Sequence, residues 1–255
     1  YYDWRFGKIY YTKKGTGSPL LLIHDTMPGA SGYEWSRIEK QLAQEHTVYT
    51  IDLLGCGRSE KAGITYTNFL FVQIICDFIK NVIKEKTDII ASGFSCSFVT
   101  TAAAYDKEIF NKIMFINPVN MNSLAQSTTK KDKLFKFLIE LPIFGTLVYH
   151  IIVSRETISD FFLNNFYYNP FHVDGDVLDA YYEASHRGGY YAKYLYSSHS
   201  AKYMNINIRH ALASLDNSIY IVEGEDEPNG KVIIDDYCKT NPAIESAVIP
   251  CSKHF

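Results

Sequence analysis

The sequence lacks the features that identify several classes of protein. It has no apolar run of the roughly 18 residues that a membrane-spanning helix needs. It also has no phosphate-binding P-loop, no glycine-rich dinucleotide fingerprint that opens a helix after a strand, and no HExxH pair of metal-binding histidines. We therefore expect no cofactor, no bound metal and no membrane-spanning segment within these residues.

The sequence also has few cysteines and only a small net charge. The five cysteines are odd in number, irregularly spaced and contain no CxxC pair, which argues against a metal knuckle or a redox pair. Free thiols in a reducing compartment are the simplest interpretation, so a cytoplasmic location is the default expectation. Net charge is −3 with scattered lysine and arginine, so a nucleic-acid partner is not expected.

The sequence begins at Tyr1 rather than at a methionine and stops at Phe255. It therefore reads as a piece of a longer protein, which we expect to continue at both ends. An N-terminal membrane tether or export signal outside this sequence is the alternative to a cytoplasmic location.

Apolar residues make up 47% of the 255 residues, enough for one large α/β domain or for a core with one insertion. Short apolar runs alternate with segments of helical spacing, which predicts a mostly parallel sheet flanked by helices. The predicted strands are Lys8–Lys13, Pro19–Ile23, Thr47–Asp52, Asp88–Ser92, Ile113–Asn117, Ser218–Glu223 and Ser246–Pro250. The predicted helices between them are Tyr66–Lys84, Ser97–Tyr105 and Lys231–Lys239.

The alternation breaks between Asn120 and about Leu215. This segment has helical stretches, including Lys133–Leu141 and Val177–Ser185, but no convincing buried strand. We therefore expect residues 1–119 and 216–255 to form the core and residues 120–215 to form a helical, aromatic-rich cap over the carboxyl ends of the strands. Open α/β sheets bind ligands at those ends.

One short motif has the setting of a catalytic nucleophile. Gly93-Phe-Ser95-Cys-Ser97 follows a predicted strand and precedes a predicted helix. A nucleophile elbow needs a serine on a tight turn there, with small residues two positions before and after it. Ser97 stands where a second glycine is usual. The competing interpretation is an ordinary strand-to-helix turn with Ser95 as the helix N-cap.

Other segments resemble the α/β-hydrolase fold family over most of the chain outside the insertion. The run LLLIHDT that ends at Thr26 resembles the family's strand and HG pair, and Asp52-Leu-Leu-Gly-Cys-Gly-Arg-Ser59 resembles its D-x-x-G-x-G-x-S loop. The segments 219–227 and 246–254 resemble the strands that carry the catalytic acid and histidine. The likeness is greatest to the cap-bearing esterases, lipases and carbon–carbon bond hydrolases.

The resemblance implies a triad in the order nucleophile, acid, histidine. Ser95 would attack an acyl carbonyl, and His254 would take its proton and later protonate the leaving group. Glu227 would orient the imidazole, with Asp226 as the runner-up acid. The other interpretation of this acidic run is a solvated turn.

The resemblance also implies an oxyanion hole formed by the backbone N–H groups of Thr26 and Cys96. Asp25 stands where the family usually has glycine, and its negative charge beside the hole would weaken catalysis unless its carboxylate bonds elsewhere. An aspartate nucleophile, as in dehalogenases, is not expected, because that branch needs the aspartate where Ser95 stands.

Ten of the 20 tyrosines lie in the insertion, which suits a partly apolar pocket with polar tips, and Tyr181 and Tyr190 are candidates for substrate contact. Simple packing of these rings onto the core is the competing interpretation. The predicted function is a serine hydrolase that cleaves an ester or related acyl bond of a small molecule. The alternatives are an inactive binding protein of the same fold, or an acyltransferase or carbon–carbon hydrolase.

Overall fold

The computed structural model describes residues 1–169, 171 and 173–254, and a seven-stranded sheet forms its centre. The strand order is β3-β5-β4-β6-β7-β8-β9, and only the edge strand β3 runs antiparallel to its neighbour. The strands are β3 (Tyr11–Lys14), β4 (Ser18–Ile23), β5 (His46–Ile51), β6 (Thr87–Ser92), β7 (Phe110–Ile116), β8 (Ser218–Gly224) and β9 (Glu245–Ile249). Each predicted strand is present, within three residues at its ends.

A small separate hairpin precedes the sheet. It pairs β1 (Tyr2–Trp4) with β2 (Gly7–Ile9), so the predicted strand Lys8–Lys13 is divided between two sheets. The central strands β4 and β6 are almost entirely buried, because both of their faces are covered by other elements.

Helices cover both faces of the sheet. The helices α2 (Asn68–Phe78), α3 (Ser95–Tyr105), α10 (Arg209–Ala213) and α11 (Gly230–Thr240) share one large apolar core with one face. On the other face, Trp35 of the short helix η1 (Gly32–Trp35) packs on Leu20, Leu22 and Val48, beside α1 (Glu39–Leu42). The predicted α/β architecture is thereby confirmed.

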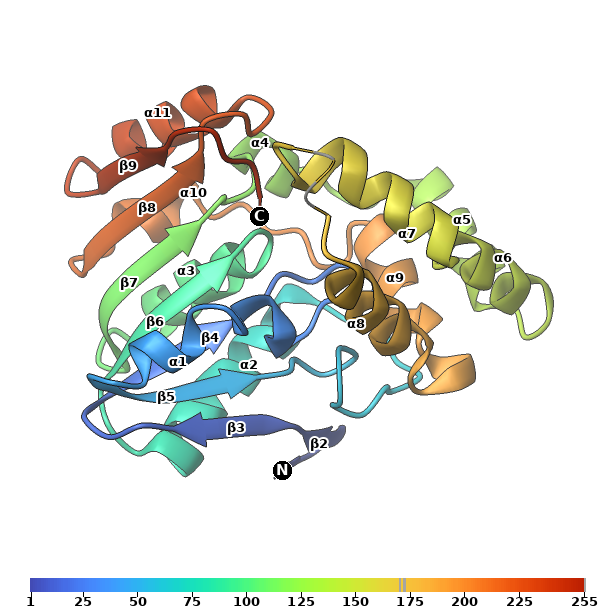
Figure 1. Ribbon diagram of the computed structural model, residues 1–255, viewed down its shortest axis with the longest axis horizontal. Helices are drawn as coiled ribbons and strands as arrows, with labels where there is room; N and C mark the ends of the chain where they lie inside the picture. Colours follow the sequence, from blue (N-terminus) through green and yellow to red (C-terminus); the bar gives the residue numbers. More distant parts are fainter. Residues whose placement is uncertain (170, 172, 255) are drawn as a thin grey trace.

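The insertion between β7 and β8 is helical. Its elements are α4 (Met121–Leu124), α5 (Lys130–Glu140), α6 (Phe144–Ile152), α7 (Arg155–Phe161), η3 (Phe162–Phe166), α8 (Gly175–His186), η5 (Gly189–Tyr191) and α9 (Lys193–Ser200). These helices lie beyond the arrowheads of the parallel strands (Figure 1). A separate apolar cluster, which includes Tyr149, Phe162 and Tyr181, holds them together. Met121, Met204 and Leu212 instead belong to the main core, so the packing unit of the cap is narrower than residues 120–215.

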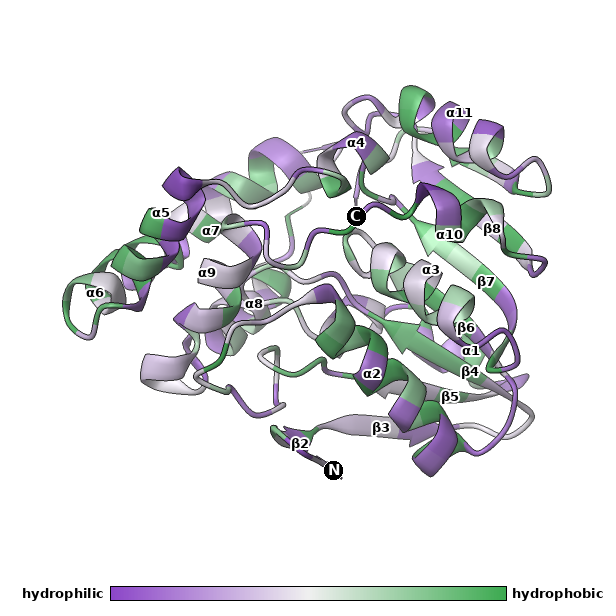
Figure 2. Cartoon of the chain, turned by 180° about the vertical axis from the view of Figure 1, so that it is seen from behind, coloured by the Kyte–Doolittle hydropathy of each residue, from purple (hydrophilic) through white to green (hydrophobic). Residues whose placement is uncertain are grey.

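Apolar colouring runs through the inner strands and along much of α2 (Figure 2). Among the described helices, none alone is long and apolar enough to cross a membrane. Only the pair α5 and α6, bent by 98°, has the length and composition when taken together.

Candidate active site

The turn after β6 centres on Gly93, not on Ser95. Gly93 has φ +53°, while Phe94 already has helical torsions and α3 begins at Ser95. The sequence predicted a helix from Ser97, which would leave Ser95 on the turn. Because α3 begins two residues earlier, the strained position between strand and helix, where a nucleophile elbow needs its serine, is held by glycine.

The structure therefore departs from the prediction at Ser95. Its side chain is fully buried, and its hydroxyl donates a hydrogen bond of 2.6 Å to the carbonyl oxygen of His24. A nucleophilic hydroxyl must reach both a base and the substrate. The geometry instead gives Ser95 a structural role, in which it ties the start of α3 to the end of β4.

The oxyanion hole also differs from the prediction. The N–H of Cys96 points back to the Gly93 carbonyl at 3.4 Å, as a helical N–H does. The N–H groups of Thr26 and Phe94 are the pair that converges, and both donate to one atom, Oδ1 of Asp25, at 2.6 and 2.8 Å. Thr26 is thus where the sequence placed it, and Phe94 replaces Cys96 because the turn is displaced by two residues.

The carboxylate of Asp25 occupies the place of a nucleophile side chain. A Cβ atom built on Gly93 would lie 2.3 Å from both Cγ and Oδ2 of Asp25, far inside contact distance. Asp25 is only half-buried, in contrast to Ser95. A partly exposed carboxylate, held by two amides, therefore stands at the carboxyl end of β6.

Two neighbouring side chains fix the backbone of Asp25. The Nδ1 of His24 donates to the Asp25 carbonyl, and its Nε2 accepts from the N–H of Leu53 at 3.0 Å, so the ring links the end of β4 to the loop after β5. The N–H of Asp25 donates to Oε2 of Glu34 at 3.0 Å, and Glu34 also accepts from the hydroxyl of Ser92. Burial raises the pKa of Glu34, although the positive charge of His254 opposes that effect.

His254 lies near this carboxylate together with its predicted acid. Its Nδ1 is 3.4 Å from Oε1 of Glu227, and both side chains are largely buried. Burial alone would lower the pKa of His254, but the contact with Glu227 and the charges of Glu34 and Asp25 outweigh burial and raise it. The runner-up acid, Asp226, is exposed. Of the two predicted acids, Glu227 is the one that contacts the imidazole.

Asn117 helps to position this pair, and the sequence analysis did not identify it. It follows β7 with φ +46°, and its Oδ1 accepts from the N–H of Gly224 at the end of β8. Its Nδ2 lies 3.4 Å from Nδ1 of His254. The only signal in the sequence was an asparagine at a strand end, a residue that tolerates positive φ.

The cap closes over the site with aromatic side chains. Phe166 stacks on His254 with ring centroids 4.3 Å apart, and His199 of α9 meets Phe94 edge-on at 4.8 Å. Tyr181 is buried in α8, where burial first and then the charges of Glu34 and Asp25 raise its pKa. Of the two candidate tyrosines, Tyr181 is thus within electrostatic reach of Asp25.

Tyr190, the second candidate, lies at the exposed edge of the cap. Its ring centroid is 4.3 Å from Nζ of Lys193, and its hydroxyl is 3.5 Å from that of Tyr194. Packing explains these contacts without a substrate.

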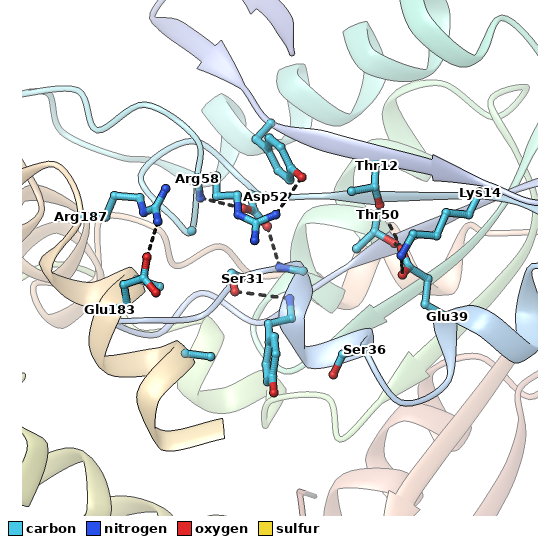
Figure 3. A pocket seen from close by; sticks show the side chains of 16 residues that line it. Thr12, Lys14, Ser31, Ser36, Glu39, Thr50, Asp52, Arg58, Glu183 and Arg187 are labelled. Atoms are coloured by element: carbon cyan, nitrogen blue, oxygen red, sulfur yellow. Dashed lines mark hydrogen bonds and ion pairs between the residues drawn. The ribbon is translucent and has the colours of Figure 1, made fainter. Parts of the chain in front are cut away.

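A polar cavity of about 240 Å³ lies between the β3 edge of the sheet and α8 (Figure 3). Its charged side chains include Lys14, Glu39, Asp52, Arg58 and Arg187, while neither Asp25 nor His254 lines it. It is thus distinct from the site around Asp25.

Asp52 organises the loop that follows β5. Its Oδ1 accepts from the N–H of Gly32 at 2.6 Å, and its Oδ2 accepts from the N–H of Arg58 at 2.7 Å. The hydroxyl of Ser59 donates back to the Asp52 carbonyl, and a Cβ on Gly57 would clash with the carboxylate. The D-x-x-G-x-G-x-S motif therefore serves a closed turn rather than catalysis.

No group of three or more His, Cys, Asp or Glu side chains that could hold a metal occurs within residues 1–169, 171 and 173–254. All five cysteines are free; Cys56, Cys76 and Cys96 are buried.

Comparisons with known proteins agree with this architecture. Residues 19–138 match the family model described as alpha/beta hydrolase fold. The chain is 26% identical over 113 residues to 2-hydroxy-6-oxo-6-(2'-aminophenyl)hexa-2,4-dienoic acid hydrolase of Metapseudomonas resinovorans, covering 44% of this chain and 39% of that protein. It is 28% identical over 109 residues to a soluble epoxide hydrolase of Corynebacterium sp., covering 43% and 37%. The chain thus spans about two fifths of the length of these curated relatives.

Among solved structures, a meta-cleavage product hydrolase from Pseudomonas fluorescens superimposes with a TM-score of 0.75. It is 18% identical, and the superposition covers 97% of this chain and 88% of that one. The shared fold therefore extends through the cap as well as the sheet.

Proposed function

The chain belongs to the α/β-hydrolase fold family, and from this premise we propose that it hydrolyses a small, partly apolar substrate with His254 as the base that activates water. Glu227 orients the imidazole and stabilises its protonated form. One observation carries the proposal: Nδ1 of His254 lies 3.4 Å from the buried Oε1 of Glu227, in the segments that resemble the acid and histidine loops.

The surroundings of His254 support a small, partly apolar substrate. Phe166 covers one face of the imidazole, and the buried Tyr181 lies within electrostatic reach of Asp25. Binding sites of this kind combine apolar walls with a few polar groups. The relatives support hydrolysis in general, since their names describe a dienoic acid hydrolase, an epoxide hydrolase and a methyl ester esterase.

Only some of the relatives support the expectation from the sequence that the substrate is an ester. Methyl ester esterases of Aliivibrio are 33% to 38% identical, over 67 residues. The Ser95 side chain is buried, and its hydroxyl is hydrogen-bonded to the carbonyl oxygen of His24. Both observations argue against an acyl-enzyme on Ser95. Ser95 is therefore included in the test as a variant and is not made part of the proposal.

The experiment measures hydrolysis of three probe classes by the wild type and by the variants His254→Ala, Glu227→Gln and Ser95→Ala. The probes are p-nitrophenyl butyrate, styrene oxide and n-butyl bromide. We expect turnover of at least one class to be lost in His254→Ala and retained in Ser95→Ala. Equal turnover in the wild type and in His254→Ala would contradict the proposal.

A second candidate is a non-catalytic binding protein of the same fold. The filled oxyanion hole favours it, because Oδ1 of Asp25 already uses the N–H groups of Thr26 and Phe94. This candidate predicts no turnover of any probe by the folded wild type, together with a small molecule that copurifies with it and is released on denaturation.

A further inference from the structure

We propose that Asp25 is the covalent nucleophile of this hydrolase, and that its substrates carry a leaving group on a saturated carbon, as epoxides and alkyl halides do. This inference deepens the proposed function and rests on it, because the second step needs His254 as the base. An aspartate nucleophile was not expected from the sequence, because a serine stands at position 95. The geometry supplies one from a different strand.

The position of the carboxylate is the first argument. Asp25 comes from the loop after β4, whereas the turn that would carry a serine lies after the neighbouring strand β6. The absence of a side chain at Gly93 leaves room for Cγ and Oδ2 of Asp25, which would lie 2.3 Å from a Cβ there. The loop carboxylate thus depends on the turn glycine, and this pairing places a carboxylate where the fold presents its nucleophile.

The orientation of the carboxylate is the second argument. Oδ1 accepts hydrogen bonds from the N–H groups of Thr26 and Phe94. Within the part of the chain that the structure describes, no hydrogen bond to Oδ2 is found. One oxygen is held by the two amides while the other keeps its lone pairs for attack, as a carboxylate nucleophile requires.

The occupied amides indicate the class of substrate. Attack on an acyl carbonyl builds negative charge on a substrate oxygen, which needs free donors close by. Here Oδ1 already uses both donors, so a substrate oxyanion would have to displace it. Displacement at a saturated carbon forms no tetrahedral oxyanion on the substrate, and the same amides serve the next step instead.

The proposed reaction has two steps, alkylation of Asp25 and hydrolysis of the resulting ester. Oδ2 attacks the carbon, the bond from that carbon to the leaving group breaks, and an alkyl ester of Asp25 forms. A halide leaves as an anion, whereas an epoxide oxygen stays attached and takes a proton from water. His254 then removes a proton from water, and the resulting hydroxide attacks Cγ of Asp25. The negative charge collects on Oδ1, facing Thr26 and Phe94, until the bond from Cγ to the alkyl oxygen breaks and the alkoxide leaves. The alkoxide takes the proton of the added hydroxyl group, which gives the alcohol and restores the carboxylate, and His254 returns its own proton to water.

The groups that face Asp25 fit this sequence. His254 acts on Asp25 electrostatically and is backed by Glu227, so the base for the second step is at the site. From the cap, His199 and Tyr181 both interact electrostatically with Asp25. Burial lowers the pKa of His199, which favours the neutral ring, and raises the pKa of Tyr181, which favours the neutral phenol. The buried hydroxyl of Thr26 has no hydrogen-bond partner among the described residues, so a polar group of a bound substrate can supply one.

The test is to trap the ester. The variant His254→Ala is incubated separately with styrene oxide and with n-butyl bromide, and the peptides are mapped by mass spectrometry. Because the first step needs no base, we expect an alkyl adduct to accumulate on Asp25 with at least one probe, and the two arms separate epoxides from halides. Asp25→Asn keeps the size and an acceptor oxygen, and we expect turnover at least about a thousandfold below that of the wild type. Asp216→Asn, an exposed residue, is the matched control.

The outcomes separate this inference from the proposed function. Loss of turnover in His254→Ala with no adduct on Asp25, or full turnover in a folded Asp25→Asn, overturns the nucleophile and leaves the hydrolase proposal standing. Turnover of the p-nitrophenyl ester alone overturns the substrate class. If Asp25→Asn does not fold, the adduct in His254→Ala still decides the matter, because that variant keeps Asp25.

Discussion

The carboxylate of Asp25 fills the space beside the Cα atom of Gly93. The carboxylate of Asp25 lies where a side chain at position 93 would stand, and its Oδ1 is bound by the amide of the next residue, Phe94. This relationship links two departures from the expected pattern, an acidic residue after the HG-like histidine and a glycine at the turn. The position of the Asp25 carboxylate requires a residue without a side chain at position 93.

The first prediction follows from that requirement. Gly93→Ser alone should destabilise the fold, because it adds a clash with Asp25 and places a side chain at positive φ. The double variant Asp25→Gly with Gly93→Ser removes the clash, frees the two amides and puts a serine on the turn near His254. We expect it to be more stable than the single variant in thermal unfolding, and to react with a fluorophosphonate probe while the wild type does not.

One labelling result would contradict this first prediction. Labelling of the wild type at Ser95, abolished by Ser95→Ala, would mean that the serine predicted from the sequence is the reactive one. It would also mean that the turn centred on Gly93 is not the reactive geometry.

The second prediction concerns the acid. Glu227→Gln should lower turnover about a hundredfold or more, because Nδ1 of His254 loses its negatively charged partner. Asp226→Asn, one residue away on an exposed side chain, should retain most of the activity. Steady-state kinetics of the two variants measure the difference, and a larger loss in Asp226→Asn would reverse the assignment of the acid.

The third prediction is a pH dependence. Only neutral His254 can act as a base, and its pKa is raised above the usual 6.5. Activity should therefore fall on the acid side with a midpoint above pH 6.5. Glu34→Gln removes one of the charges that raise this pKa, so its acid limb should move to lower pH. Identical pH profiles for the wild type and Glu34→Gln would contradict the electrostatic account.

The fourth prediction concerns stability. Burial raises the pKa of Glu223 to about 7, and the charge of Glu227 adds to that effect. Since the folded state holds the proton more tightly than the unfolded state, stability contributed by this group is present at low pH and is lost as pH rises from about 4.5 towards and above 7. Glu223→Gln should therefore raise the free energy of unfolding by about 1 kcal/mol or more at pH 8, and by much less at pH 5. Urea denaturation at the two pH values measures this, and an equal effect at both would contradict it.

The fifth prediction concerns Lys61, which closes the loop after β5. Its buried Nζ donates to the carbonyl oxygens of Cys56, Gly57 and Ser59. Lys61→Met removes these three hydrogen bonds from buried surroundings and should lower the free energy of unfolding by about 2 kcal/mol or more. Lys40→Met, on the exposed surface, should change it by less than about 0.5 kcal/mol. Equal unfolding midpoints for the two variants would contradict the role of Lys61.

The sheet could be predicted from the sequence because its strands are short apolar runs between turn residues. Leu20–Ile23 and Ile89–Ala91 are buried on both faces, and such runs admit few other interpretations. His254 and Glu227 could be proposed as a pair as well, because each lies a few residues after the end of a predicted strand, β9 and β8 respectively.

The reacting group could not be predicted in the same way. The run Gly93–Ser97 contains only small residues around Phe94, so it allows a turn at Ser95 or at Gly93. The helix begins at Ser95 without a side-chain N-cap, and no local signal marks that start. What selects the register is the tertiary contact of Asp25 with the Phe94 amide, between residues 69 positions apart. Glu34 and Asn117 were missed for the same reason, because their roles depend on partners from other strands.

The most direct test of the central claim is a single turnover in water enriched in heavy oxygen, with enzyme in excess over styrene oxide or n-butyl bromide. If Asp25 is the nucleophile, the alcohol formed carries an ordinary oxygen from Oδ2. The heavy oxygen then appears in the Asp25 side chain, where peptide mass spectrometry detects it. If the heavy oxygen appears in the product and the Asp25 peptide keeps its ordinary mass, water attacks the substrate directly and the account is wrong.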